Sequence, residues 1–215
     1  MDDVVNEQID KTLRELRQAK RPVERSRISK TSNGYIFLIA WSNASLLRIL
    51  NRKFTSTLPK SEYRLKAQSD DSCRSVVANI EEGFARQTTS EYINFLGYSR
   101  ASLIEEKGDI QRSLQDGFLR SIPGSNLKDL GIDLTEWHEA LKKSVISKTN
   151  NTNYRELEDF IGKVKVTDLT YEIFIELINK TDWNIRKLIE SLEKKMNADQ
   201  KFYKVEKMRI YEKFK

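Results

Sequence analysis

The chain contains very few of the side chains that enzymes use for chemistry. Of its 215 residues one is a histidine, His138, and one is a cysteine, Cys73. A zinc centre made of His and Cys ligands needs more of them than a single chain offers. A Ser–His–acid or Cys–His pair would have to use His138. The phosphate-binding patterns GxxxxGK[ST] and GxGxxG do not occur. The sequence therefore predicts no catalytic residues, no cofactor and no metal ion.

Both rare residues are expected to have structural roles. Cys73 has small and apolar neighbours, which predicts a buried side chain. A single cysteine excludes a disulfide within the chain and suits a reducing cytosol, so we expect a cytoplasmic protein. His138 lies in the charged segment TEWHEALKK and is expected to be solvated. A di-iron bundle needs a Glu-x-x-His motif on two helices, which one histidine cannot supply.

Basic residues are concentrated near the two ends of the chain. The net charge is +6; residues 11–30 carry +6, residues 194–215 carry +5, and the first ten residues carry −4. Such ends attract polyanions through a term that weakens as salt rises. They can instead serve only to keep a nearly neutral core soluble, and the sequence leaves both interpretations open. The candidate nucleic-acid-binding residues are Lys11, Arg14, Arg17, Lys20, Arg21, Arg25, Arg27, Lys201, Lys204, Lys207, Arg209 and Lys213.

Aromatic residues are interleaved with these bases in the tail FYKVEKMRIYEKFK. Phe202, Tyr203, Tyr211 and Phe214 are of the kind that stacks on unpaired bases while lysines bind phosphate. In the alternative interpretation, Tyr203, Lys207, Ile210 and Phe214 form one helical face that packs on a neighbour. The tail sequence does not decide between these two roles.

Helices must position these residues, because apolar side chains recur every three or four positions in four long segments. The predicted helices cover about 35–57, 62–86, 88–115 and 167–197, and Thr88 with Glu91 predicts a capping box at the third. Similar lengths and short connections indicate antiparallel neighbours. The predicted fold is all-α, an antiparallel up-down four-helix bundle.

Three further segments complete the predicted organisation. A basic arm and linker (1–33) contains a short amphipathic helix over 3–20, with apolar positions Val4, Val5, Ile9, Leu13 and Leu16. The bundle occupies 34–197 and has a helical insertion at 117–166 between its third and fourth helices. The basic aromatic tail is 198–215. No run of about 18 apolar residues occurs, so we expect no membrane partner.

The stretch VVANIEEGFARQTTSEYINFLGYSRASLIEE, from Val76 to Glu106, carries a family resemblance. It is similar to the pattern N-I-A-E-G-F-x-R, a Ser/Thr-rich turn, E-F/Y-I-x-F-L and A-R-x-S-L-x-E of the 23S rRNA intervening-sequence proteins. The resemblance covers about 34–115 and, more loosely, the last helix, which resembles the suffix helix of longer members. Glu81 departs from the usual alanine. The family-motif residues considered as a site are Asn79, Glu82, Gly83, Arg86, Arg100 and Glu105.

The resemblance implies an up-down four-helix bundle whose relatives assemble into homopentamers. One branch, the accessory variability determinant of diversity-generating retroelements, is a basic pentamer that works with a reverse transcriptase and its RNA. Other members are encoded within intervening sequences of ribosomal RNA genes. The family provides no established catalytic residues to transfer to this chain.

Structural roles are the simpler explanation for most of the motif. Gly83 near a helix end is expected to take the left-handed C-cap conformation. Asn79 is expected to hydrogen-bond to a neighbouring helix, while Glu82 and Glu105 pair with Arg74, Arg86 or Arg100. Trp41 and Trp183 fall beside their helical seams and are expected at a subunit interface.

Together these features predict a non-enzymatic, homo-oligomeric bundle protein, by resemblance a pentamer. Its expected partners are RNA or DNA, or a nucleoprotein such as a retroelement reverse transcriptase. The alternative is a protein–protein adaptor without nucleic-acid binding, in which the insertion at 117–166 holds a client and the basic ends only add solubility.

Overall fold

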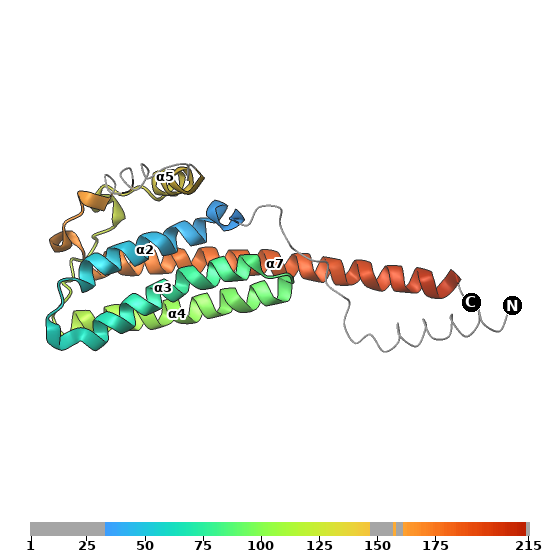
Figure 1. Ribbon diagram of the computed structural model, residues 1–215, viewed down its shortest axis with the longest axis horizontal. Coiled ribbons are helices and arrows are strands. Elements are labelled where there is room, and N and C mark those ends of the chain that lie inside the picture. The colour runs from blue at the N-terminus through green and yellow to red at the C-terminus, as the bar shows by residue number, and fades with distance from the viewer. Residues whose placement is uncertain (1–32, 147–156, 158–160, 214–215) are drawn as a thin grey trace.

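The computed structural model describes residues 33–146, 157 and 161–213, and over these residues it is helical, with no strand. Four long helices alternate in direction: α2 (Ile39–Thr55), α3 (Tyr63–Ala85), α4 (Thr89–Gln115) and α7 (Tyr171–Lys213) (Figure 1). This confirms the predicted antiparallel four-helix bundle. Short 3₁₀ turns precede or connect them: η1 (Gly34–Phe37), η2 (Lys60–Glu62), η3 (Leu127–Leu130) and η4 (Val166–Asp168).

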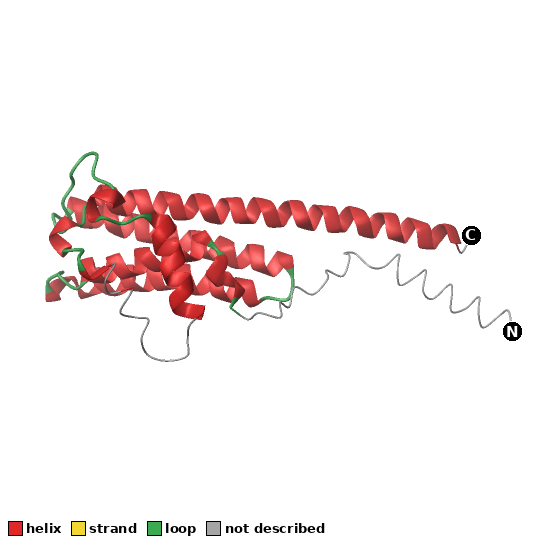
Figure 2. Ribbon diagram, turned by 90° about the horizontal axis from the view of Figure 1, so that it is seen from above, coloured by secondary structure: helices red, strands yellow, loops and turns green. Residues whose placement is uncertain are grey.

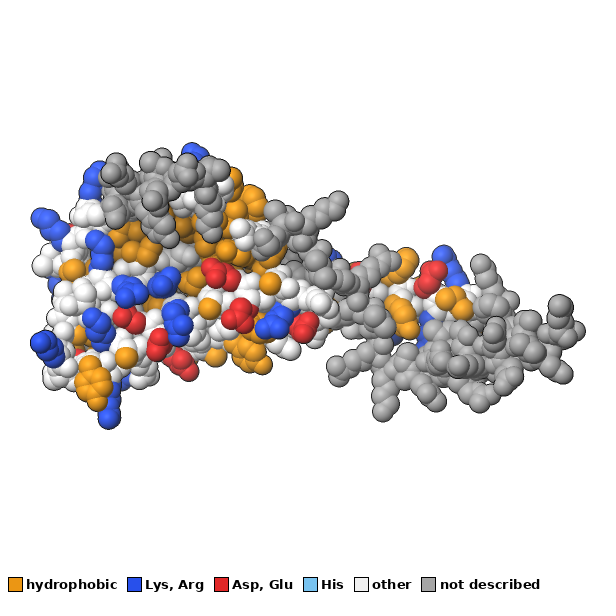
Figure 3. All heavy atoms as spheres, viewed as in Figure 1, with side chains coloured by type: hydrophobic (Ala, Val, Ile, Leu, Met, Phe, Trp, Pro, Cys, Tyr) orange, Lys and Arg blue, Asp and Glu red, His pale blue; other side chains and the backbone are white. Residues whose placement is uncertain are grey.

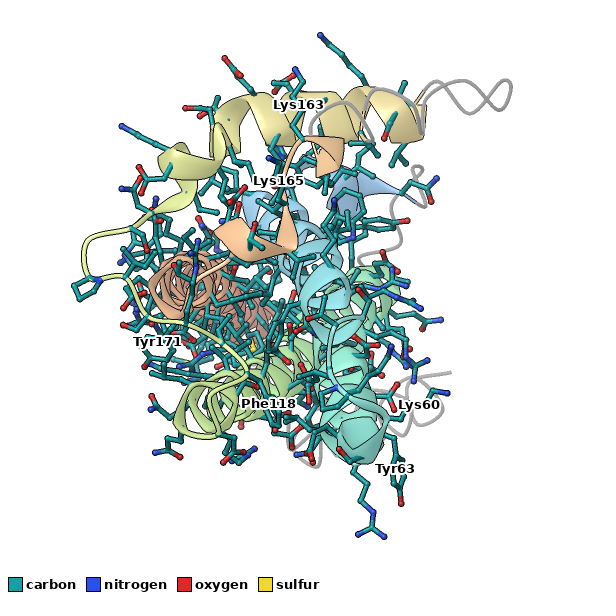
Figure 4. The ribbon with its side chains drawn as sticks, turned by 90° about the vertical axis from the view of Figure 1, so that its left-hand side faces the viewer. Lys60, Tyr63, Phe118, Lys163, Lys165 and Tyr171 are labelled. Atoms are coloured by element: carbon teal, nitrogen blue, oxygen red, sulfur yellow. The ribbon has the colours of Figure 1, made fainter. Side chains whose placement is uncertain are left out.

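The four helices stand at the corners of a square. Each packs on its two neighbours, with α3 between α2 and α4, and α7 closing the bundle between α4 and α2 (Figure 4). Their apolar seams meet in a continuous core that includes Leu50, Ile80, Leu103 and Phe174, all exposed by 1% or less. Cys73 is in this core and fully buried, which confirms its predicted structural role.

The turn from α3 to α4 brings the two helices close together at Gly83. Thr88 Oγ1 accepts from the Glu91 amide at 3.1 Å and Glu91 Oε2 accepts from the Thr88 amide at 3.3 Å, which confirms the predicted capping box. The predicted left-handed conformation of Gly83 is wrong, because Gly83 lies inside α3 and the described glycines with positive φ are Gly117, Gly124 and Gly131. What Gly83 provides is space for the start of α4.

Replacement of Gly83 by alanine is therefore expected to destabilise the bundle. A Cβ atom at this position would lie 2.7 Å from Phe95 Cβ and 2.7 Å from Tyr92 Cδ2. Forcing apart this contact should cost about 1–3 kcal/mol of unfolding free energy, measured by urea denaturation. Gly97→Ala in α4 is the matched control, since nothing lies within 4 Å of its Cβ position. The control should gain about 0.5–1 kcal/mol, and equal effects of both changes would contradict the account.

The insertion between α4 and α7 packs on the bundle through α5 (Leu134–Ile146), which crosses α2. The indole Nε1 of Trp137 donates to the Ser42 carbonyl oxygen at 2.7 Å, and the Trp137 side chain is fully buried. His138 Nδ1 lies 3.0 Å from Ser42 Oγ and is partly buried, so the predicted solvated histidine is wrong. Burial lowers the pKa of His138, with Lys142 adding to the effect. Helix α5 is thus anchored to α2 at Ser42.

The two tryptophans expected at an interface lie in different surroundings. Trp41 is buried within the chain and its Nε1 donates to Glu81 Oε1 at 2.8 Å. This bond gives Glu81 a partner within the subunit and, with the burial of the ring, makes Trp41 a core residue. Trp183 is 53% exposed on α7.

Helix α7 extends well past the end of the bundle. The helix expected to end near Asn197 continues to Lys213. Residues 171–213 contain no glycine or proline, the two residue types that most strongly disfavour a helix interior. At about 1.5 Å per residue α7 spans about 64 Å, against about 40 Å for α4. Its C-terminal part projects alone among the described helices (Figure 2).

Candidate nucleic-acid interface

The projecting part of α7 carries the predicted basic tail residues. Leu192 is the last buried residue of α7, and every described side chain from Glu193 to Glu212 is exposed or half-buried. Helix geometry turns successive residues by about 100°, so the bases lie on several sides of the rod. Lys201, Lys204 and Arg209 are exposed and Lys207 is half-buried, while Lys213 is the last residue of the helix.

Large apolar side chains share this rod with the bases. Phe202 is 59% exposed, Val205 53% and Met208 66%. Tyr203 and Ile210 lie on another side and are half-buried. Phe202 is thus the aromatic ring on the first side that could stack on a base between lysines, and the side with Tyr203 and Ile210 suits packing on a helix.

The basic arm residues lie outside the described residues. They are Lys11, Arg14, Arg17, Lys20, Arg21, Arg25 and Arg27. The bundle as a whole is nearly neutral, because residues 31–193 carry a net charge of −1, although residues 48–66 at one end of it carry +5. Both signs of charge are mixed over the face of the bundle in Figure 3. Among the described residues, the distal end of α7 is therefore the basic segment that projects away from the bundle, with +3 over 201–213.

The family-motif residues make contacts within the fold. Arg100 Nε donates to Asp182 Oδ1 at 2.8 Å, joining α4 to α7. Arg86, the first residue after α3, pairs with Glu82 at 3.5 Å, and its guanidinium carbon lies 4.3 Å from the centre of the Phe95 ring. The motif thus ties α3 to α4 and α4 to α7.

Two of the expected motif contacts differ in the structure. Glu105 is exposed and accepts from Ser72 Oγ at 3.5 Å rather than pairing with an arginine in the described contacts. Arg74 pairs with Asp71 one turn away. Asn79 is half-buried. The motif residues are spread over α3 and α4 and form no common pocket with the tail bases.

A cluster of buried polar side chains lies inside the bundle where α2, α3 and α4 meet. The carboxyl group of Glu106 is fully buried, with its two oxygens 3.0 and 3.3 Å from Ser69 Oγ. Ser69 Oγ is also 3.0 Å from Asn51 Oδ1. Asn51 Nδ2 and Thr55 Oγ1 in turn donate to Asp70 Oδ1, at 3.3 and 2.8 Å.

Donor counting indicates that Glu106 is protonated. Ser69 has a single hydroxyl hydrogen, yet its oxygen faces both a carboxyl group and an amide oxygen. A neutral Glu106 resolves this, because its O–H donates to Ser69 Oγ while the Ser69 hydroxyl donates to Asn51 Oδ1. Burial raises the pKa of Glu106 to about 8; the nearby Asp109 and Asp70 contribute to this rise, and hydrogen bonds with Ser69 and Cys73 oppose it. Burial and the neighbouring Glu106 also raise the pKa of Cys73, which makes this thiol unreactive.

Sequence reasoning missed this cluster, although the pattern contains a sign of it. Leu103 and Ile110 lie on the buried face of α4, seven residues apart, and Glu106 occupies the seam position between them. Asp109 is also buried; Arg112 Nη2 donates to its Oδ1 at 2.5 Å, and Oδ2 has no partner among the described residues. Among residues 33–146, 157 and 161–213, no group of three or more His, Cys, Asp and Glu side chains is arranged to hold a metal ion.

A shallow groove of about 360 Å³ lies between α2, α5 and α7. The Asn43 side chain is buried there and its Oδ1 has no partner in the described part of the chain. Two of its apolar lining residues, Trp183 and Ile39, are exposed. Its lining residues are Ile39, Asn43, Leu134, Asn179, Lys180, Trp183 and Asn184.

The fold and these contacts define a class of protein, an antiparallel four-helix bundle with α5 packed on α2 and a long, basic last helix. Residues 37–143 match the family model of the 23S rRNA-intervening sequence protein. The chain belongs to this family. The match begins before α2 and ends within α5, so it contains the motif residues but not α7. No curated protein matches the chain. Every helix in the described part of the chain is too short or too polar to span a bilayer.

Proposed function

We propose that this protein is a non-enzymatic, homo-oligomeric bundle protein that binds nucleic acid through its basic ends. The observation that carries the proposal is the distal part of α7, where Lys201, Lys204 and Arg209 project beyond the bundle beside exposed apolar side chains. Such an arrangement suits phosphate contacts and base stacking on a single strand.

Assembly would multiply this charge. Each subunit brings +6, so a ring of several subunits presents many projecting basic helices to one polyanion. A homopentamer is the assembly that the resemblance implies. Light scattering or mass photometry should then give a mass near five times that of the 25.2 kDa chain. If the protein is a monomer, the positive charges of several subunits are not combined and this part of the proposal fails.

RNA is the nucleic acid that we place first, because the family is associated with intervening sequences of ribosomal RNA. The protein would alternatively bind RNA that is part of a complex with another protein. The specific example is a retroelement reverse transcriptase with its RNA. DNA binding would follow the same charge argument. A cytoplasmic location fits each of these partners.

A filter-binding titration with a structured RNA, repeated at several salt concentrations, tests the proposal. The affinity should fall steeply as salt rises, because each phosphate contact releases counterions. Deletion of residues 1–30 and 198–215 should abolish binding while the helical circular dichroism of the bundle and its oligomeric mass remain. Absence of binding at low salt, or an affinity that does not respond to salt, would reject nucleic-acid binding.

The groove between α2, α5 and α7 favours a second candidate function, a protein–protein adaptor. Its exposed Trp183 and the buried polar Asn43 are typical of a small docking site for a peptide. In that case the basic ends serve only solubility. The adaptor becomes the better explanation if the RNA titration fails while Trp183→Ala removes binding of a client.

A further inference from the structure

The projecting part of α7 continues the apolar seam of the bundle beyond the helices that cover it. Leu192, Met196, Tyr203 and Ile210 are four, seven and seven residues apart, so they lie on one side of α7, where Asp199 and Glu206 occupy the alternate positions. Leu192 is buried, and the other three are half-buried on a helix whose opposite side exposes Val205 and Met208. A seam of this kind indicates one partner helix running alongside residues 196–210.

The start of the described chain lies at the right place to supply that helix. The η1 turn and the α3–α4 turn are at the end of the bundle from which α7 projects (Figure 1, Figure 2). Residues 1–32 therefore attach there. The linker over 21–33 can span about 40 Å when extended. The amphipathic segment 3–20 would be about 27 Å long as a helix, close to the length of about 24 Å from 198 to 213.

Charge selects the direction of such a pair. The segment 1–10 carries −4 and 11–20 carries +3, whereas α7 carries −1 over 190–200 and +3 over 201–213. An antiparallel pair places opposite charges together in both halves. A parallel pair places like charges together in both halves. The chain direction agrees, because the segment must lead back toward Asn33 at the bundle.

We propose that residues 3–20 dock as an antiparallel helix on the seam of α7 at residues 196–210 of the same subunit. The acidic side chains Asp2, Asp3, Glu7 and Asp10 then lie beside Lys204, Lys207 and Lys213. This inference builds on the proposed function in one respect: the acidic segment competes with a polyanion for the distal bases of α7.

Zero-length carbodiimide cross-linking of the full-length protein tests the docking directly. This reagent joins a carboxylate to a lysine amine in contact, forming an amide with loss of water. Mixing ¹⁴N- and ¹⁵N-labelled chains before assembly separates links within a chain from links between chains. We expect links within one chain from residues 2–10 to Lys204, Lys207 or Lys213. Links only between chains, or none to residues 201–213, would overturn the proposal.

Charge reversal gives a second readout that needs no cross-linker. In the triple variant Asp3→Lys, Glu7→Lys, Asp10→Lys, the backbone amides of 198–213 should exchange hydrogen about tenfold faster, because they lose a packed partner. Adding Lys204→Glu, Lys207→Glu and Lys213→Glu to the same chain should restore slow exchange. The control variant Asp71→Lys, Asp116→Lys, Asp168→Lys changes three exposed acids elsewhere and should leave these amides unaffected. Unchanged exchange in the first variant would contradict the docking.

The docking and the proposed nucleic-acid function can fail separately. Cross-linking and hydrogen exchange contain no RNA, so they report on the docking alone. If the arm competes with RNA, the variant Asp3→Asn, Glu7→Gln, Asp10→Asn should bind a structured RNA about tenfold more tightly at low salt. Confirmed docking with no RNA affinity would leave the helix pair in place and reject the proposed function.

Discussion

Raising the pH from 5 to 8 is expected to lower the unfolding free energy of the protein through Glu106. The pKa of this buried carboxyl is about 8 in the folded state, against about 4.5 when it is exposed. The folded state therefore keeps a proton that the unfolded state releases, and stability is lost as pH rises from about 4.5 to 8. The expected loss between pH 5 and 8 is about 3 kcal/mol, measured by urea denaturation.

Other titrating groups make comparison with variants necessary. The pKa of His138 is lowered, which favours the folded state as pH rises and so opposes the effect of Glu106. Glu106→Gln keeps the size and neutrality of the buried side chain, so its stability should change much less between pH 5 and 8. Glu105→Gln changes the exposed neighbour and should retain the wild-type pH dependence. An identical pH dependence of wild type and Glu106→Gln would contradict a protonated Glu106.

Replacing Trp137 by alanine is expected to cost about 3–5 kcal/mol of unfolding free energy. The side chain is fully buried between α5 and α2, and its Nε1 donates to the Ser42 carbonyl oxygen at 2.7 Å. The change removes a large apolar contact and leaves a buried carbonyl group without this donor. Urea denaturation gives the overall loss, and hydrogen exchange should show that α5 amides lose protection first.

Trp183→Ala is the matched control for this change. Its side chain is 53% exposed, so the loss should stay below about 1 kcal/mol. The loss of unfolding free energy in Trp137→Phe should lie between those of Trp137→Ala and Trp183→Ala, because phenylalanine keeps an aromatic ring in the contact but has no N–H donor. A loss at Trp137 no larger than that at Trp183 would mean that α5 is not anchored to the bundle through Trp137.

The periodicity of the sequence was sufficient to predict the bundle because each long helix has one apolar side. The capping box at Thr88 was predictable for a similar reason, since both of its hydrogen bonds lie within four residues. The reason for Gly83 was not predictable, because it depends on how closely Tyr92 and Phe95 of the next helix approach. Helix ends can be predicted from a few neighbouring residues, whereas the distance between two helices depends on how the whole structure packs.

The contacts of α5 were beyond sequence reasoning for the same reason. His138 lies in a charged segment that suggests solvent, yet the opposing residue, Ser42, is 96 positions away. Glu106 was missed because a carboxylate in an apolar seam goes against residue preference, and only the positions of Ser69 and Asn51 explain it. The basic end of α7 was predicted correctly as a charged segment, but its projection from the bundle required the lengths of all four helices.

The most direct measurement of the central claim is the salt dependence of RNA affinity in two matched variants. Lys201→Gln, Lys204→Gln, Arg209→Gln removes three bases from the projecting part of α7, and Lys60→Gln, Lys66→Gln, Lys107→Gln removes three exposed bases from the bundle. The first variant should reduce the slope of log affinity against log salt by about 2 for single-stranded RNA and weaken binding about 100-fold at 0.1 M salt. The second should match the wild type. Equal slopes for the two variants would contradict binding through the distal end of α7.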